Sequence, residues 1–177
     1  MLIAIDASVD HGDALAAGAI RGAKLIMLDP QQNAIGQITQ AIHRSNSFKS
    51  LHIVTHGSPG CLHFSSGNLT LDSLPTYAAQ IESWFGDRPL TKGSAVRVKS
   101  SDNFLSLYAC SLAVGDAGKA FLEKLQFLTG VSIHASQGRV SSTAHGGSWQ
   151  LEVALPFPHE AAFPFAHDLL DTRETVL

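Results

Sequence analysis

Short runs of apolar residues alternate with longer amphipathic segments along most of this 177-residue chain, and this alternation limits the possible folds more than any other feature. The apolar runs span residues 2–8, 23–28, 50–55, 104–109 and 131–135, a length typical of strands buried on both faces. The helical segments span residues 10–20, 33–43, 72–85 and 117–128. Repeated strand–helix–strand units predict an α/β fold with a mostly parallel sheet and helices on both faces.

The remaining segments predict smaller features around this sheet. Residues 61–71 alternate weakly around a Ser-Ser-Gly-Asn turn, which predicts a small hairpin, and residues 148–155 predict an edge or hairpin strand. The polar stretch 87–102 is interpreted as a surface excursion. We expect one α/β domain over residues 1–155 and a Pro/Phe-rich tail over residues 156–177, which acts either as a strap over an apolar groove or as a linker.

Composition excludes several classes of protein. A net charge of −3 argues against a nucleic-acid partner, and no apolar run approaches the roughly 20 residues of a membrane span. The N-terminus lacks the basic region of a signal peptide, which predicts a cytoplasmic protein. Two cysteines cannot form a disulfide framework, and none of the nine histidines lies in a zinc-binding motif, so we expect no metal and no cofactor.

Two reactive residues follow successive predicted strands. His56 comes directly after the third strand and Cys110 directly after the fourth. If these strands are neighbours, both side chains lie at the carboxyl edge of the sheet, where open α/β proteins bind their ligands. An adjacent imidazole can activate a thiol as a nucleophile, and Gly57 leaves its backbone N–H accessible to an oxyanion. The alternative is structural: Cys110 as a small buried side chain and His56 as a turn residue.

The same residues resemble a known superfamily. Thr55-His56-Gly57-Ser58 followed by Leu107-Tyr108-Ala109-Cys110-Ser111 resembles the caspase-like (clan CD) cysteine peptidases, in which one strand ends in His-Gly and the next ends in Ala-Cys or Gly-Cys. More narrowly, the chain resembles a bacterial domain of unknown function found near the N-terminus of large repeat-bearing surface proteins. The further segments that carry this resemblance are 5–8, 28–30, 56–60, 108–115, 129–131, 135–136 and 146–152.

This resemblance implies a three-layer caspase-like sandwich with a small hairpin and a His–Cys dyad. Cys110 would be the nucleophile and His56 the general base and acid, and the backbone N–H groups of Gly57 and Cys110 would form the oxyanion hole. No third catalytic acid is assigned. In this fold the substrate pocket lies between the first, fourth and fifth strands, so Asp6, Tyr108 and Ser136 are candidate lining residues.

Several of these residues have a simpler interpretation. The Asp6 carboxylate could favour a basic P1 residue, or it could accept hydrogen bonds from the backbone of the turn that follows it. Asp116 is interpreted as a cap of the next helix, and Cys61 as an ordinary, partly buried cysteine.

We therefore expect a cysteine endopeptidase that works through an acyl-enzyme on a polypeptide or on a linked segment of its own chain. The alternative is a catalytically inactive interaction or adhesion-associated domain with the same fold. A third interpretation is another hydrolase or an acyltransferase that uses the same Cys–His pair. Related domains belong to proteins exported by routes that need no N-terminal signal, so export is the alternative to a cytoplasmic location.

Overall fold

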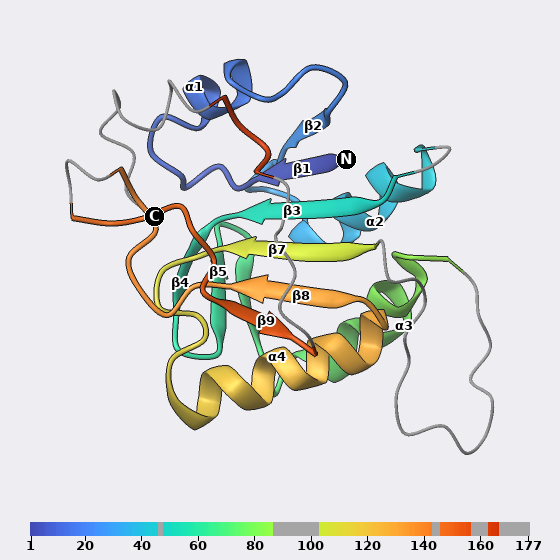
Figure 1. The fold of residues 1–177 in the computed structure, drawn as a ribbon. Helices are drawn as coiled ribbons and strands as arrows, with labels where there is room; N and C mark the ends of the chain where they lie inside the picture. Colours follow the sequence, from blue (N-terminus) through green and yellow to red (C-terminus); the bar gives the residue numbers. More distant parts are fainter. Residues whose placement is uncertain (46–47, 87–102, 143–145, 157–162, 167–177) are drawn as a thin grey trace.

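A computed structural model describes residues 1–45, 48–86, 103–142, 146–156 and 163–166 of the chain. The fold is built on a six-stranded sheet with the strand order β2-β1-β3-β7-β8-β9 (Figure 1). Its strands are β1 (Leu2–Ile5), β2 (Lys24–Met27), β3 (Ser50–Val54), β7 (Phe104–Tyr108), β8 (Ser132–Ala135) and β9 (Val153–Leu155). All neighbouring pairs are parallel except β8 and β9, which confirms the predicted mostly parallel α/β fold.

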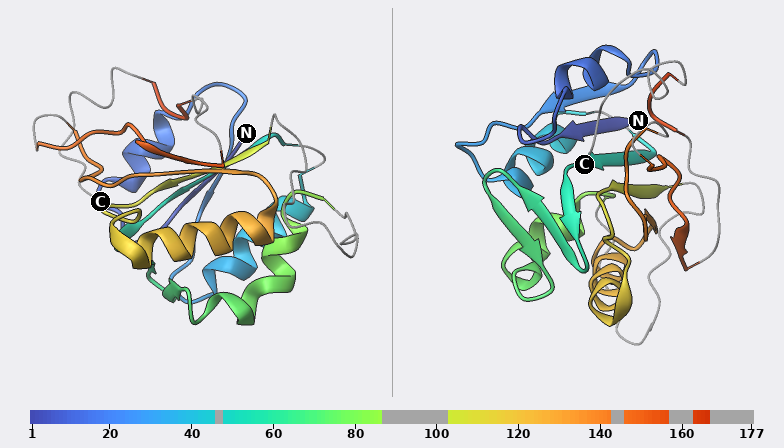
Figure 2. Two further views of the ribbon diagram at one scale, coloured as in Figure 1. Left: turned by 60° about the horizontal axis from the view of Figure 1, so that its bottom comes forward. Right: turned by 90° about the vertical axis from the view of Figure 1, so that its left-hand side faces the viewer.

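Helices cover both faces of the sheet. The helices are α1 (Gly12–Ala17), α2 (Ala34–His43), α3 (Leu74–Ser83) and α4 (Gly115–Thr129). Figure 2 shows α2, α3 and α4 on one face and α1 on the other. The side chains of β1 explain this arrangement, because Leu2 and Ala4 belong to the core beneath α2–α4 whereas Ile3 and Ile5 belong to the core beneath α1. Successive strand residues point to opposite faces, so a strand between two helical layers must be apolar at every position.

The ends of the helices differ in part from the sequence-based expectation. Helix α1 is shorter than the predicted range 10–20: it has six residues, and its N-cap is His11, with no side-chain capping bond. Asn33 caps α2 by accepting a hydrogen bond from the Gly36 N–H at 2.9 Å. Gly130 ends α4 in a left-handed conformation, φ 67°, which glycine adopts without steric cost.

A second, three-stranded antiparallel sheet lies beside the carboxyl ends of the main strands (Figure 2, right). It consists of β4 (His56–Ser58), β5 (Cys61–Phe64) and β6 (Gly67–Thr70). The predicted hairpin accounts for β5 and β6. Residues 56–58, which lie before the predicted hairpin, pair with β5 as a third strand. Leu62, Phe64 and Leu69 anchor this sheet in the core beneath α2–α4.

The described part of the tail packs on the α1 side of the sheet. Phe165 is 2% exposed and forms an isolated β-bridge with Ala19, just after α1. The Ile20 N–H donates to the carbonyl of Pro164 at 3.0 Å, which ties the same segment to the loop after α1. The predicted surface excursion 87–102 and tail residues 157–162 and 167–177 lie outside the described residues. Within the described parts of the chain, no helix is long and apolar enough to cross a membrane.

Candidate active site

The two reactive residues predicted from the sequence follow neighbouring strands. In the β3–β7 ladder, Val54 lies opposite Tyr108, and the Thr55 N–H extends the pairing by donating to the Tyr108 carbonyl at 3.1 Å. His56 comes two residues after Val54, and Cys110 comes two residues after Tyr108. The prediction that both residues follow the carboxyl ends of adjacent parallel strands is therefore confirmed.

Gly57 allows the two segments to lie against each other. A Cβ atom at position 57 would be 2.7 Å from the Ala109 Cβ and 3.1 Å from the Cys110 carbonyl oxygen. The first of these contacts is shorter than real Cβ atoms show, so a residue with a side chain at position 57 would force the two segments apart. The glycine beside His56 therefore has a packing role that does not depend on any catalytic role.

The ring of His56 has a defined hydrogen-bonding partner. Its Nε2 atom lies 3.0 Å from the backbone carbonyl oxygen of Ser8, in the turn that follows β1. Because a carbonyl oxygen can only accept, Nε2 must carry the proton. In the neutral ring this leaves Nδ1 as the basic nitrogen. The sequence analysis did not predict this contact, because Ser8 and His56 are 48 residues apart.

Cys110 lies at a sharp turn held by the segment after β8. Its side chain is half-buried, and its sulfur accepts a hydrogen bond from the Val140 N–H at 3.2 Å. The next residue, Ser111, has a φ of 56°, which is uncommon for a residue with a side chain. The Ser111 N–H donates to the Gly138 carbonyl at 2.8 Å, so the segment 138–140 fixes both Cys110 and the turn after it.

Asp6 is 2% exposed and its carboxylate is bound by two serines. The backbone N–H and hydroxyl of Ser8 donate to Oδ1 at 3.0 and 2.6 Å. The hydroxyl of Ser65, in the turn between β5 and β6, also donates to Oδ1 at 2.6 Å, and the Ser65 N–H lies 3.0 and 3.1 Å from the two oxygens. The Ser8 contacts agree with the interpretation that the Asp6 carboxylate accepts hydrogen bonds from the turn that follows it. Ser65 is a second partner, which was not predicted from the sequence.

The other two candidate lining residues are buried. Tyr108 is 1% exposed, with its ring near those of His52, Trp149 and Phe163, and burial raises the pKa of its hydroxyl. Ser136 is 0% exposed; its hydroxyl accepts from the Gly138 N–H at 3.0 Å. Tyr108 therefore belongs to the core, and Ser136 shapes the segment that contacts Cys110.

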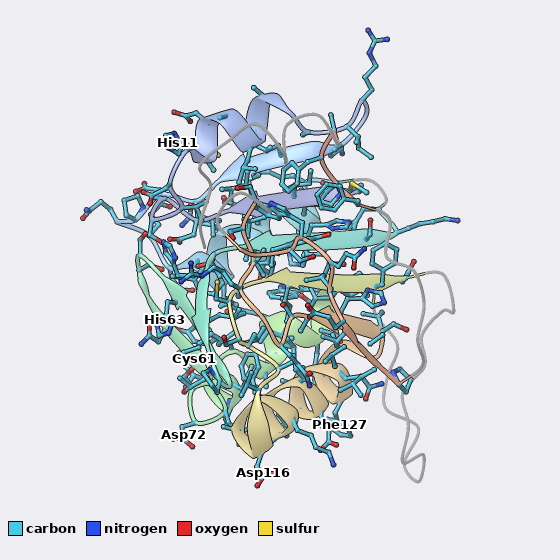
Figure 3. All side chains as sticks on the ribbon, turned by 60° about the vertical axis from the view of Figure 1, so that its left-hand side comes forward. His11, Cys61, His63, Asp72, Asp116 and Phe127 are labelled. Atoms are coloured by element: carbon cyan, nitrogen blue, oxygen red, sulfur yellow. The ribbon has the colours of Figure 1, made fainter. Side chains whose placement is uncertain are left out.

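The outer face of the small sheet carries a side-chain network that the sequence analysis did not predict. In the register of this sheet, His63 lies between His56 and Asn68, and Ser58 lies opposite Cys61. His63 Nε2 is 2.8 Å from the Ser58 hydroxyl, and His63 Nδ1 is 3.1 Å from Asn68 Oδ1. Figure 3 shows Cys61 and His63 on the side of the sheet that faces away from the core. Had residues 56–58 been recognised as a strand, the alternation of side chains would have placed Ser58, Cys61, His63 and Asn68 on one face of the small sheet.

Two further predicted features have structural outcomes. Asp116 lies in the first turn of α4, but the N-cap is Val114 and no side chain caps it, so the predicted capping role of Asp116 is wrong. Cys61 is half-buried, as expected. Within the described residues, no group of three or more His, Cys, Asp or Glu side chains could hold a metal ion.

A family model matches residues 2–177, which is nearly the whole chain. The protein belongs to the family described as a domain of unknown function, DUF4347. No curated protein and no solved structure matches the chain. The family assignment agrees with the narrower resemblance found in the sequence, to a domain of unknown function.

Proposed function

We propose that this domain is a cysteine endopeptidase of the caspase-like type, with Cys110 as the nucleophile and His56 as the general base. The observation that carries the proposal is the hydrogen bond between His56 Nε2 and the Ser8 carbonyl, at the sheet edge where Cys110 also lies. This bond fixes the tautomer in which Nδ1 can accept a proton. It also places a carbonyl dipole where it stabilises the imidazolium that forms when the thiol is deprotonated.

The proposed reaction proceeds in two steps. The Cys110 sulfur attacks the carbonyl carbon of the scissile peptide bond, its proton passes to His56, and the oxyanion is bound by the backbone N–H groups of Gly57 and Cys110. The amine then leaves with the proton from His56, and a thioester to Cys110 remains. Water, deprotonated by His56, attacks the thioester carbonyl; the C–S bond breaks, the acid is released, and the Cys110 sulfur takes back the proton from His56. The substrate is a polypeptide or a linked segment of the same chain.

The strand order supports a site at this position. In the order β2-β1-β3-β7-β8, the chain leaves β1 toward one face of the sheet and leaves β3 toward the other face. Such a position is a switch point, and ligands of open α/β sheets bind there, outside the carboxyl ends of the strands. Ser8 follows β1 and His56 follows β3, so their hydrogen bond lies at this switch point.

The alternative is a catalytically inactive interaction domain with the same fold. The observation that favours it is the contact between Cys110 and Val140, because the half-buried sulfur is already in a hydrogen bond with the backbone. In this alternative Cys110 is a packing residue and the His56 bond only fixes the turn after β1.

The reactivity of Cys110 tests the proposal without knowledge of the substrate. In a Cys61→Ser protein, which leaves one thiol, we expect iodoacetamide to label Cys110 at pH 7 at least 10-fold faster than in the Cys61→Ser/His56→Ala protein. Equal and slow labelling in both would favour the inactive domain and overturn the proposal.

Cleavage of peptides varied at P1 tests the reaction itself. We expect Cys110→Ala and His56→Ala to lose activity, Cys61→Ser to keep it, and mass spectrometry to detect an acyl group on Cys110. Activity that survives in Cys110→Ala would exclude the proposed dyad. An acyl group on Cys110 that is transferred to an added amine rather than hydrolysed would indicate an acyltransferase.

A further inference from the structure

Asp6 joins the two structural units that meet at His56. It is the residue directly after β1, and its backbone N–H donates to the Val54 carbonyl at 2.9 Å, so its main chain is fixed to the central sheet. Its side chain is bound by Ser8 on one side and by Ser65 on the other. A carboxylate that is 2% exposed and accepts from two backbone N–H groups and two hydroxyls is held in one orientation.

The two serines lie at the two ends of the His56 hydrogen bond. Ser8 supplies the carbonyl that accepts from His56 Nε2, and the N–H and hydroxyl of the same residue donate to Asp6. Ser65 lies in the turn between β5 and β6, and β5 pairs with β4, the strand that begins at His56. Through these two serines, the Asp6 carboxylate sets the position of the Ser8 carbonyl, which is the acceptor. It also sets the position of the small sheet, which carries the His56 donor.

We propose that Asp6 is a positioning residue, which fixes the tautomer and orientation of His56 by holding the Ser8 turn against the small sheet. This proposal rests on the proposed function, in which the Nδ1 atom of His56 takes the proton of Cys110. Without the Asp6 carboxylate, Ser8 loses the acceptor of its N–H and its hydroxyl, and the turn no longer holds its carbonyl toward the ring. The ring can then carry its proton on either nitrogen, and only one of these tautomers leaves Nδ1 basic.

The same contacts distinguish a positioning role of Asp6 from a role in substrate specificity. A carboxylate that binds a basic P1 side chain must be reachable by substrate, whereas Asp6 is buried and bound by protein donors. A specificity residue changes which P1 residues are accepted. A positioning residue lowers kcat for every substrate and leaves the P1 preference unchanged.

The test compares Asp6→Ala, which removes Oδ1, the oxygen that accepts from both serines, and Ser65→Ala with the matched control Ser66→Ala, all in the Cys61→Ser background. Ser66 lies in the same turn as Ser65, but its hydroxyl accepts from the Ala34 N–H and does not contact Asp6. The first measurement is the tautomer of His56, read from its ring ¹⁵N shifts. We expect the Nε2–H form alone in the Cys61→Ser parent and in Ser66→Ala, and a mixture in Asp6→Ala.

The second measurement is the rate at which iodoacetamide labels Cys110 as a function of pH. We expect a loss of about 10- to 100-fold in Asp6→Ala, the range for a displaced catalytic group, a smaller loss in Ser65→Ala, and a change of less than about twofold in Ser66→Ala. Peptide cleavage, once a substrate is found, should show reduced kcat with the same order of P1 preference.

The outcomes distinguish this proposal from the proposed function. If His56→Ala slows labelling but folded Asp6→Ala and Ser65→Ala keep the parent's tautomer and rate, Asp6 is not a positioning residue and the dyad stands. If His56→Ala has no effect on labelling, the dyad fails. A changed P1 preference in Asp6→Ala with an unchanged tautomer would make Asp6 a specificity residue. If Asp6→Ala does not fold, Ser65→Ala decides, because it removes only one hydroxyl from an exposed turn residue.

Discussion

The Nε2 atom of His56 lies 3.0 Å from the carbonyl oxygen of Ser8, so the turn after β1 is joined to the segment after β3 by a side chain. The strands β1 and β3 are neighbours in the sheet although β2 lies between them in the sequence. The His56 ring is oriented by a backbone group, which no side-chain substitution can remove directly. The relationship therefore makes the backbone around Ser8 part of the candidate site.

Substitution of Gly57 by alanine tests the close approach of the His56 and Cys110 segments. The new Cβ would be 2.7 Å from the Ala109 Cβ, so the start of β4 must move away from β7. We expect a loss of about 1–3 kcal/mol in the free energy of unfolding, typical of overpacking, together with slower alkylation of Cys110. Urea denaturation and mass spectrometry measure the two effects.

Gly36→Ala is the matched control for this substitution. Gly36 lies in α2, and the nearest atom to its added Cβ is the Asn33 Oδ1 at 3.6 Å, an ordinary contact. We expect this variant to be more stable by about 0.5–1 kcal/mol, because alanine favours the helix. Similar stability changes in both variants would contradict the steric role of Gly57.

Acid is expected to destabilise the fold through His52. This side chain is 0% exposed, and burial lowers its pKa from 6.5 to about 3, with smaller contributions from the N-terminal amine and His134. Between about pH 6.5 and pH 3 the unfolded chain binds a proton at His52 that the folded chain does not, so the free energy of unfolding falls as pH falls. From pH 7.5 to pH 4.5 this residue should account for a loss of about 2–3 kcal/mol.

A variant that cannot titrate at position 52 checks this prediction. We expect urea denaturation of His52→Leu to show a smaller decrease in the free energy of unfolding between pH 7.5 and 4.5 than the unmodified chain shows. The exposed His43 serves as the control, and His43→Gln should retain the full decrease. The prediction is wrong if the decreases are the same in all three proteins.

The N-terminus of α2 depends on one side chain. Asn33 accepts from the Gly36 N–H and donates through Nδ2 to the Tyr77 hydroxyl at 2.9 Å, which also links α2 to α3. We expect Asn33→Ala to lower the free energy of unfolding by about 1–2 kcal/mol. Asp116→Ala, in α4 where no side chain caps the helix, should cost less than about 1 kcal/mol. A larger loss from Asp116→Ala, measured by thermal unfolding, would contradict this difference.

The two thiols should differ in reactivity. Burial raises the pKa of the Cys61 thiol, an effect that a hydrogen bond with Ser58 partly opposes, so little thiolate forms at neutral pH. In Cys110→Ala we expect iodoacetamide to label Cys61 more slowly than it labels free cysteine at pH 7.4. The labelling rate should continue to increase as the pH is raised above 9. Labelling that is faster than free cysteine and constant between pH 6 and 8 would show that Cys61 is the activated thiol of this chain.

Much of the central sheet could be predicted from the sequence because its strands are buried on both faces. The apolar runs at 2–8, 23–28 and 50–55 contain β1, β2 and β3, each slightly shorter than its run. Helix α4 was located, as residues 117–128, by its helical pattern. The strand β4 was missed because His-Gly-Ser has neither apolar alternation nor strand-forming residues, and it is a strand only because β5 lies beside it.

The candidate site was predictable only in part. The positions of His56 and Cys110 follow from local sequence, because each comes directly after an apolar run in a parallel sheet. The partners of His56 and Asp6 do not follow from it, since they depend on how turns 48 and 59 residues distant in sequence pack together. The network of Ser58, His63 and Asn68 was missed together with β4, whose register places these residues on one face.

The sequence by itself determined that this chain forms a mostly parallel α/β sheet and that a histidine and a cysteine follow two successive strands of it. Periodicity and apolar content act over a few residues, so they can be recognised without knowing the fold. Only the tertiary structure decided that β1 lies beside β3, that the Ser8 carbonyl meets His56, and that Asp6 binds both Ser8 and Ser65. These contacts join distant turns, and their geometry is set by the packing of the whole sheet.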